Sequence, residues 1–475
     1  MTSAADAAGA TPPLRRVRPA TMFAYGFGAA AYGVKDFCFS TFLLLFYNQV
    51  LGLPSAEVGF AIMCALLFDA FIDPAIGFLS DRTRTRWGRR HPWMYAAAVP
   101  IALGWLLLWN PPAWSHGAML VWVFATAVLV RTAVSAYEVP SQALSAELSA
   151  DYDERTRIMA YRYLFGWTGG MAMLMASYGR FLADGLLDRQ GYVGFAIAGA
   201  AAMFTAILVS SLGTHREIER LPRPEIVRGT LSENFRELGE TVRNRAFVTL
   251  MGAGLCFYSA QGINYALSNY LYAHVWHFAG ADFQWLALSL LLGVVVAFVA
   301  APRIAHRIGK PAAAMAFMAS AAVLVGLPYA LRLIGLFPLP GTPWMLPLLL
   351  GIYGLNAACG VASTILGASM MADVVEHSEI QTGRRSEGVF FAGAFFIQKC
   401  TSGLGIFAAG AILAIVGFPE AAKPGTVPAA TLDRLTILFA LLYLVLGLGA
   451  AALYWRFPFG KDEHLARVER LRAAV

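Results

Sequence analysis

The stretch FDAFIDPAIGFLSDRTRTRWGRRHPW, residues 68–93, places two aspartates in apolar sequence and follows them with an arginine-rich loop. Five arginines lie between residues 82 and 90. A charged side chain at the bilayer centre costs about 2.5 to 3.5 kcal/mol, so it persists where it pairs or faces a polar cavity. Arginines just past a membrane segment instead anchor its cytoplasmic end. The stretch therefore predicts a membrane helix with functional carboxylates and a cytoplasmic loop.

The composition of the whole chain is that of a membrane protein. Of its 475 residues, 58% are hydrophobic and 14% are charged, and the mean hydropathy is +0.59. Crossing a hydrocarbon core takes roughly 20 apolar residues. We therefore predict an all-α polytopic membrane protein with twelve transmembrane helices in two six-helix halves. The predicted spans are residues 22–48, 55–80, 92–110, 117–148, 157–182, 193–213, 247–275, 282–302, 311–332, 344–372, 386–416 and 432–456.

A single long polar interruption divides these spans into six and six. The predicted parts are an N-terminal tail (1–21), a first half (22–213), a central loop (214–246), a second half (247–456) and a C-terminal tail (457–475). The halves repeat weakly, because APRIAHRIGK after the eighth span resembles GFLSDRTRTRWGRR after the second. Two such halves are typical of secondary transporters that rock around a midplane site. A channel is the structural alternative, but the sequence contains no filter-like segment or repeated pore motif.

Basic residues predict the orientation of the chain. With both termini cytoplasmic, few basic residues outside the spans face outward, and they are Arg180, Arg189, Arg332, Lys423 and Arg434. We therefore expect a monomeric protein of the inner (plasma) membrane with both termini in the cytoplasm. Its net charge of +7 predicts membrane lipids rather than nucleic acid as partners. Five cysteines lie inside predicted spans without metal-ligand spacing, which indicates packing residues: Cys38, Cys64, Cys256, Cys359 and Cys400.

Several motifs carry a resemblance to known transporters. The loop arrangement Gly77, Asp81, Arg82, Gly88, Arg89 and Arg90 resembles the signature of the major facilitator superfamily. The segments YGFGAAAYGVKDF, DxxxDPxxGxxSDRTRTRWGRRxPW, AYEVPSQAL, DYDERTRIMAYRYLFGW, MMADVVEHSEIQTGRRSEG and FFIQKC resemble, in order, the glycoside-pentoside-hexuronide:cation symporter family, of which melibiose permease is the best-known member. The resemblance implies a cytoplasmic gate braced by Asp81, Arg82, Arg89, Arg90 and Arg384.

Eight charged residues lie inside the predicted spans, four acids and four bases. They are Lys35, Asp36, Asp69, Asp73, Arg131, Glu138, Arg162 and Lys399. A shared polar cavity explains all of them, whereas the alternative is a set of ion pairs that hold helices together.

The coupling-ion site is predicted around Asp69 and Asp73, which are four residues apart and share a helix face. Two close carboxylates either keep a proton on one of them or bind a small hard cation, so both are metal ligands only if the carrier uses sodium. Ser135 is a further candidate ligand, and the resemblance implies that Lys399 reaches the aspartates. No cofactor is expected besides the coupling ion, H+ or Na+. We expect a proton, because Ile72 and Phe395 replace two polar groups of the melibiose permease pattern.

The solute site is predicted beside it. Arg131, Ser135, Glu138 and Gln142 recur at helical spacing along the fourth span, and Tyr32 and Asp36 share a polar stripe on the first. The resemblance implies that Asp36, Glu138 and Arg162 contact a sugar, glycoside or uronate, and Asn264 is a weaker candidate from the second half. The alternatives are an amphipathic solute such as a lysolipid and, from another class, an intramembrane enzyme. No enzyme is expected, because the eight histidines lie in loops or near span ends.

Overall fold

The described residues form long helices joined by short loops. The computed structural model describes residues 17–149, 152–218, 244–382 and 387–458. The first half contains α1 (Pro19–Phe27), α2 (Ala29–Leu45), η1 (Phe46–Val50), α3 (Ser55–Arg82), α4 (His91–Trp109), α5 (His116–Leu148), α6 (Tyr152–Ala176), η2 (Ser177–Phe181) and α7 (Arg189–His215). The second half contains α9 (Arg245–His274), α10 (Gly280–Ile308), α11 (Lys310–Leu333), α12 (Met345–Thr382), α13 (Glu387–Ile415) and α14 (Ala429–Trp455).

These helices confirm the predicted membrane architecture. The segments α1, α2 and η1 together form one membrane crossing, Pro19–Val50. The helix α6 continues directly into η2, and the two together correspond to a further predicted crossing. Among the described residues, 11 helices are long and apolar enough to cross a membrane. The predicted crossing that falls outside this set is α6, because its first turns carry the charged sequence DERTR and Arg162 follows within it.

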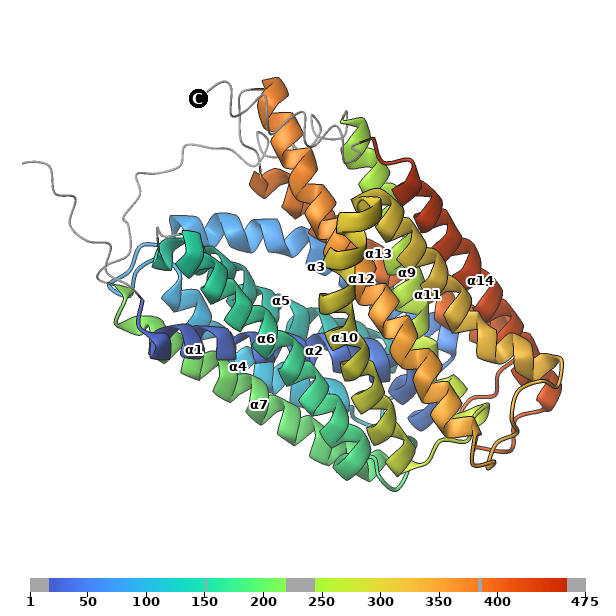
Figure 1. Ribbon diagram of the computed structural model, residues 1–475. Coiled ribbons are helices and arrows are strands. Elements are labelled where there is room, and N and C mark those ends of the chain that lie inside the picture. The colour runs from blue at the N-terminus through green and yellow to red at the C-terminus, as the bar shows by residue number, and fades with distance from the viewer. Residues whose placement is uncertain (1–16, 150–151, 219–243, 383–386, 459–475) are drawn as a thin grey trace, which may run out of the picture.

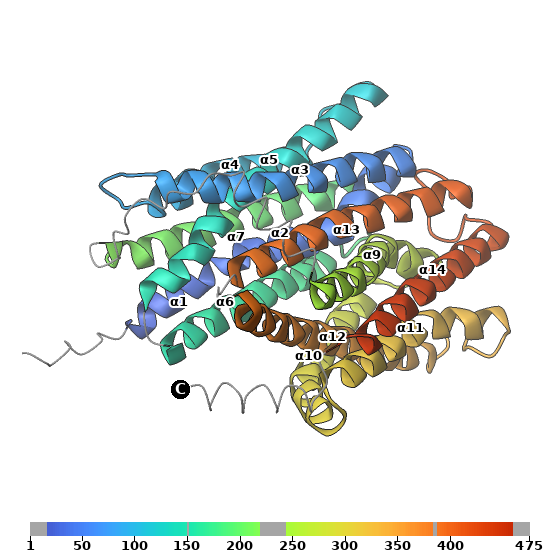
Figure 2. The ribbon, with the colours of Figure 1, turned by 90° about the horizontal axis from the view of Figure 1, so that it is seen from above.

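The two halves repeat the same packing pattern. In the first half α2 packs on α6, α3 on α5, and α4 on α5 and α7; in the second half α9 packs on α13, α10 on α12, and α11 on α12 and α14. Figures 1 and 2 show the two bundles side by side, with α3 against α13 across the boundary. The sequence repeat around GFLSDRTRTRWGRR is therefore the trace of a structural repeat of six helices.

Glycines bring equivalent helices close together in both halves. A Cβ added at Gly33 of α2 would lie 1.8 Å from the carbonyl oxygen of Gly166 on α6. At the equivalent crossing, a Cβ at Gly405 of α13 would lie 2.4 Å from the carbonyl oxygen of Ser259 on α9. Because lipid tails are as apolar as the helices, close backbone packing supplies much of the cohesion within a membrane bundle.

The halves meet tightly at one end and diverge at the other. At the closed end, Asn269 of α9 donates to the carbonyl of Thr41 (3.2 Å) and accepts from the Tyr178 hydroxyl (2.8 Å). Nearby, Tyr270 donates to Asn48 at 2.9 Å. Figure 1 shows α6 and α10 adjoining at this end and separating toward the upper end of the view.

Candidate functional site

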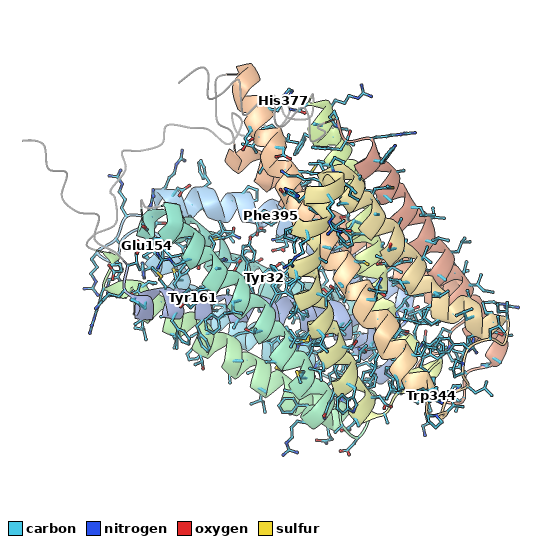
Figure 3. The ribbon with its side chains drawn as sticks, in the orientation of Figure 1. Tyr32, Glu154, Tyr161, Trp344, His377 and Phe395 are labelled. Atoms are coloured by element: carbon cyan, nitrogen blue, oxygen red, sulfur yellow. The ribbon has the colours of Figure 1, made fainter. Side chains whose placement is uncertain are left out.

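A cavity of about 2650 Å³ lies between the halves and is lined by residues from both. Tyr32 and Phe395, labelled in Figure 3, lie in the space between the diverging halves. The charged lining residues within the membrane region come from the first half, apart from Lys399 of α13. Most of the second half's described lining is apolar, including Leu291, Val295 and Phe298 of α10. The ionic chemistry of the cavity is thus concentrated on one wall.

Asp69 is buried at the centre of a polar cluster on α3. Its Oδ2 lies 2.9 Å from Nε of Arg131 on α5 and 2.9 Å from Nζ of Lys399 on α13. Its Oδ1 accepts a hydrogen bond from the Ser135 hydroxyl at 3.0 Å. Asp69 is only 1% exposed, so these partners replace the water that a carboxylate needs. Both carboxylate oxygens are therefore already engaged by protein donors.

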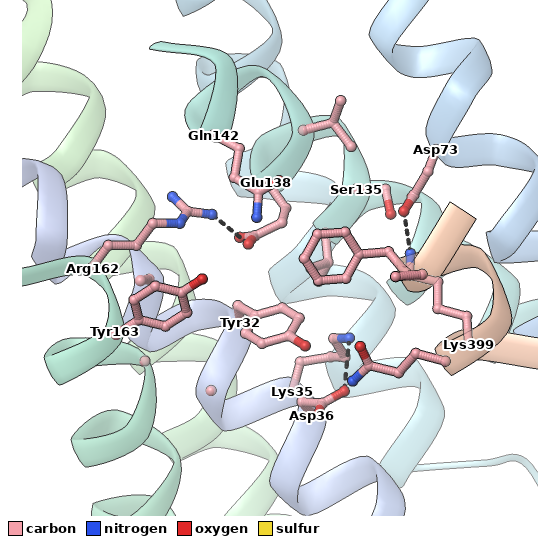
Figure 4. Close-up of a pocket in the computed structure, with 18 of the residues that line it drawn as sticks. Tyr32, Lys35, Asp36, Asp73, Ser135, Glu138, Gln142, Arg162, Tyr163 and Lys399 are labelled. Atoms are coloured by element: carbon pink, nitrogen blue, oxygen red, sulfur yellow. Dashed lines mark hydrogen bonds and ion pairs between the residues drawn. The ribbon is translucent and has the colours of Figure 1, made fainter. Parts of the chain in front are cut away.

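Asp73 lies one turn further along α3, at the cavity wall. Its Oδ2 forms an ion pair with the Lys399 amine, as Figure 4 shows. The same amine lies 2.9 Å from Asp69 Oδ2 and therefore bridges both aspartates. Asp73 Oδ1 is buried and has no hydrogen-bond partner among the described residues. Pro74 lies inside α3 and donates no backbone hydrogen bond, which loosens the helix at this turn. One carboxylate oxygen of Asp73 therefore has no hydrogen-bond partner among the described residues, whereas the other pairs with a lysine from the opposite half.

Arg131 has a different neighbour from the one its spacing predicts. The sequence pattern groups Arg131 with Glu138 and Gln142 as a solute-binding stripe. In the structure it is buried, pairs with Asp69 and lies with its guanidinium carbon 5.1 Å from the centre of the Phe39 ring. The physical reason is the close packing of α3 on α5, which brings a buried carboxylate within reach of the guanidinium.

Glu138 and Arg162 form the second polar cluster, between α5 and α6. The Arg162 guanidinium forms an ion pair with Glu138 Oε1 and also donates to the hydroxyls of Tyr25 (3.2 Å) and Ser141 (3.1 Å). The other carboxylate oxygen, Glu138 Oε2, has no hydrogen-bond partner among the described residues. Figure 4 shows this pair facing the same space as Tyr32 and Gln142, both of which line the cavity. The cluster offers a solute one charged acceptor held in a fixed position.

The third cluster lies on α2. Asp36 projects a carboxylate that is 41% exposed into the cavity, and Lys35 lies 3.4 Å from it. The Lys35 amine also lies 4.7 Å from the centre of the Tyr32 ring. Two side chains that single-sequence reasoning did not select, Tyr163 and Trp167 of α6, line the same region and are partly exposed. In the sequence, the only indication of a role for these two residues is their spacing of four. Aromatic side chains that simply pack against each other on a helix have the same spacing.

Asn264 does not line the cavity. On α9 the lining side chains include Gln261 and Tyr265, whereas Asn264 is outside the lining and its backbone carbonyl accepts from the Ser268 hydroxyl. The helix therefore turns a neighbouring polar face toward the cavity, and Gln261 takes the position expected for the amide.

Among the described gate residues predicted from the sequence, Asp81 and Arg90 contact one another. Arg90 lies 2.5 Å from Asp81 and 3.0 Å from Glu147, and Arg89 lies 2.7 Å from the same glutamate. Arg82 instead lies over the Phe78 ring, with its guanidinium carbon 3.6 Å from the ring centre. Glu147 was not selected from the sequence. Arg384 lies outside the described residues.

The second half has a matching ion pair in the equivalent loop. Lys310 follows Gly309 and lies 2.7 Å from Asp373 of α12, as Arg89 follows Gly88 and pairs with Glu147 of α5. Both glycines have positive φ angles, 74° at Gly88 and 86° at Gly309, which side chains other than glycine rarely adopt. The repeat therefore extends to the conformation of the loops.

Comparisons with known proteins give a consistent result. Residues 24–461 match the family described as MFS/sugar transport protein. The chain is 24% identical to an isoprimeverose transporter of Lactiplantibacillus pentosus over 83% of this chain and 80% of that protein. It is also 24% identical to a glucuronide carrier protein homolog of Escherichia coli, over 84% of each chain.

Solved structures agree on the fold. The nucleoside transporter NupG superposes with a TM-score of 0.63 over 91% of this chain and 98% of that chain, at 14% sequence identity. The three polar clusters around Asp69, Glu138 and Asp36 lie at a cavity between two repeated bundles. The chain is therefore a multi-pass membrane transporter of the MFS/sugar transport protein family, in the glycoside-pentoside-hexuronide:cation symporter group of the major facilitator superfamily.

Proposed function

We propose that the protein couples the uptake of a sugar, glycoside or uronate to the inward movement of a cation. The observation that carries this proposal is the placement of two ionic clusters about one cavity between the two halves. One cluster, Glu138 with Arg162, offers an unpartnered acceptor oxygen. The other, Asp69 and Asp73 with Lys399, joins the two halves of the protein.

The class of solute is proposed from the hydrogen-bond donors and acceptors that the first half contributes to the cavity wall. Adjacent sugar hydroxyls both donate and accept. Glu138 Oε2 is an acceptor without a donor among the described residues, and the partly exposed Asp36 carboxylate, which pairs with Lys35, faces the same cavity. Tyr32, Tyr163 and Trp167 add aromatic faces on which the C–H surface of a sugar ring packs. The names of the relatives, an isoprimeverose transporter and a glucuronide carrier homolog, support the same class.

Coupling is proposed to act through the bridge between α3 and α13. Lys399 holds the two halves together by contacting Asp69 and Asp73, so a cation arriving at Asp73 competes with the lysine for the carboxylate. Release of the bridge then allows the halves to rock, while the loaded solute stabilises the closed arrangement. Ion and solute thereby move together because each favours the same conformation.

We propose a proton as the coupling ion. Sodium needs several oxygen ligands, and the residue before Asp73, Ile72, and the residue one turn before Lys399, Phe395, are both apolar. A proton needs a single acceptor, and Asp73 Oδ1 is unpartnered. In the proposed orientation both termini are cytoplasmic in the inner membrane, so the cavity opens to the cytoplasm.

Two measurements test the proposal. Purified protein is first screened for thermal stabilisation by monosaccharides, glycosides, uronates and lysolipid, because a bound ligand raises the melting temperature. Uptake of the stabilising solute is then measured in proteoliposomes with an alkaline interior and no sodium. Stabilisation by lysolipid alone overturns the sugar assignment. Uptake that stays flat under the pH gradient and appears under an inward sodium gradient overturns the proton assignment.

A further inference from the structure

We propose that Arg131 is a built-in cation that occupies the position beside Asp69 where a coupling sodium ion would bind, and that it thereby decides the ion specificity of the carrier. This inference rests on the proposed function, since ion specificity has meaning only in a coupled carrier. It assigns Arg131 a specificity role in place of the solute contact that its spacing in the sequence predicts.

Both carboxylate oxygens of Asp69 are engaged by protein donors. Arg131 Nε lies 2.9 Å from Oδ2, Lys399 Nζ lies 2.9 Å from the same oxygen, and the Ser135 hydroxyl donates to Oδ1 at 3.0 Å. Both members of the pair are buried, Arg131 at 4% and Asp69 at 1% exposed, and Arg131 lines the cavity whereas Asp69 does not. A sodium ion that coordinated Oδ2 would have to displace the guanidinium or the Lys399 amine.

Displacing Arg131 is unfavourable because its charge is permanent. A guanidinium stays protonated in proteins, whereas a lysine amine loses its proton readily when buried. The Phe39 ring, 5.1 Å from the guanidinium carbon, gives the cation a second favourable contact. Arg131 therefore holds its position beside Asp69, while Lys399 is the cation that exchanges.

The balance of charges around the cluster depends on Arg131. On α2, α3, α5 and α13, the carboxylates Asp36, Asp69 and Asp73 face the bases Lys35, Arg131 and Lys399. These three negative and three positive charges are balanced without any bound ion. Removal of Arg131 alone leaves an excess negative charge beside Asp69.

A purely structural role for Arg131 makes a different prediction. An arginine that only braces α3 against α5 causes a loss of stability when removed, and that loss does not depend on which salt is present. An arginine that occupies an ion position leaves behind a carboxylate, a serine hydroxyl and an excess negative charge, which together favour a hard cation. The dependence of stability on sodium therefore separates the two roles.

The experiment compares melting temperatures in about 100 mM sodium chloride and in equal choline chloride. The wild type is expected to show no sodium-specific difference. Arg131→Met should gain a sodium-specific rise of roughly 2 °C or more, and adding Asp69→Asn should remove it. Arg131→Lys keeps a basic group, but one that loses its proton more readily when buried, so any sodium-specific rise in this variant should be smaller than in Arg131→Met. Arg332→Met is the matched control, because it removes an arginine from an ion pair with Asp433 outside the cavity.

Each outcome decides the inference. A sodium-specific rise in the wild type that disappears in Asp69→Asn overturns it, while leaving the proposed symport in place with sodium as the ion. A folded Arg131→Met without the rise also overturns it, and Arg131→Gln serves as a second neutral variant if the first does not fold. The proposed function fails separately, when the wild type accumulates no sugar-class solute under either a proton or a sodium gradient.

Discussion

Removal of either member of the Glu138–Arg162 pair is expected to abolish tight solute binding. Arg162 is buried and donates to Glu138, Tyr25 and Ser141. In Arg162→Ala, the Glu138 carboxylate loses its charge partner, and its Oε2 has no hydrogen-bond partner in the described structure to compensate. In Glu138→Ala, the guanidinium loses the carboxylate, and the cavity loses the acceptor proposed for a solute hydroxyl.

The magnitude follows from the burial of the pair. Breaking a buried ion pair by removing one partner costs about 3 to 5 kcal/mol of folding stability, because a charge is left uncompensated. Truncating one partner of a buried charge pair at a binding site costs at least about 2 kcal/mol of binding free energy. The second figure corresponds to a roughly 30-fold increase in the dissociation constant.

The assay measures two quantities on each purified variant, the dissociation constant of the best solute from the screen and the melting temperature without solute. The double variant Glu138→Ala with Arg162→Ala should be less destabilised than the sum of the single variants, because it leaves no orphaned charge. Its solute affinity should remain low. Stability and binding are therefore separated within one set of proteins.

Arg332→Ala is the matched control for these measurements. Arg332 forms an ion pair with Asp433 at 2.8 Å, and the two side chains are 25% and 42% exposed. A partly exposed pair of this kind contributes at most about 1 kcal/mol, and it lies outside the cavity lining. Unchanged solute affinity in both Arg162→Ala and Glu138→Ala refutes the assignment of this pair to the solute site.

Three further predictions concern other parts of the molecule. Asp73→Asn should abolish concentrative uptake in proteoliposomes while leaving the protein folded and inserted, and full accumulation would contradict the proposed coupling role. Gly33→Ala should lower stability by about 1 to 3 kcal/mol, because its Cβ would lie 1.8 Å from the Gly166 carbonyl; Gly351→Ala, whose Cβ meets nothing within 4 Å, is the control, and equal melting temperatures would count against tight packing there. Glu147→Gln should lower the melting temperature because two arginines pair with this carboxylate, and an unchanged value would show that the pairs add no stability.

The sequence by itself determined the membrane architecture, because hydrocarbon requires about 20 apolar residues for each crossing. That local requirement marks helices such as α3 and α14 without knowledge of their neighbours. The same requirement identified the charged residues within the spans, because a charged side chain in hydrocarbon has a high free-energy cost and is therefore rare there. The aspartates of α3 share a face for an equally local reason, the helical repeat.

Only the tertiary structure decided which charges are partners. Helical spacing along α5 groups Arg131 with Glu138, but the packing of α5 on α3 brings Arg131 to Asp69 instead. Glu147 carries no distinguishing local signal, yet the fold places it between two arginines of the loop after α3. Ion pairs between distant segments depend on where whole helices cross, and a crossing is set by side chains and glycines on both helices together, which no single stretch of sequence contains.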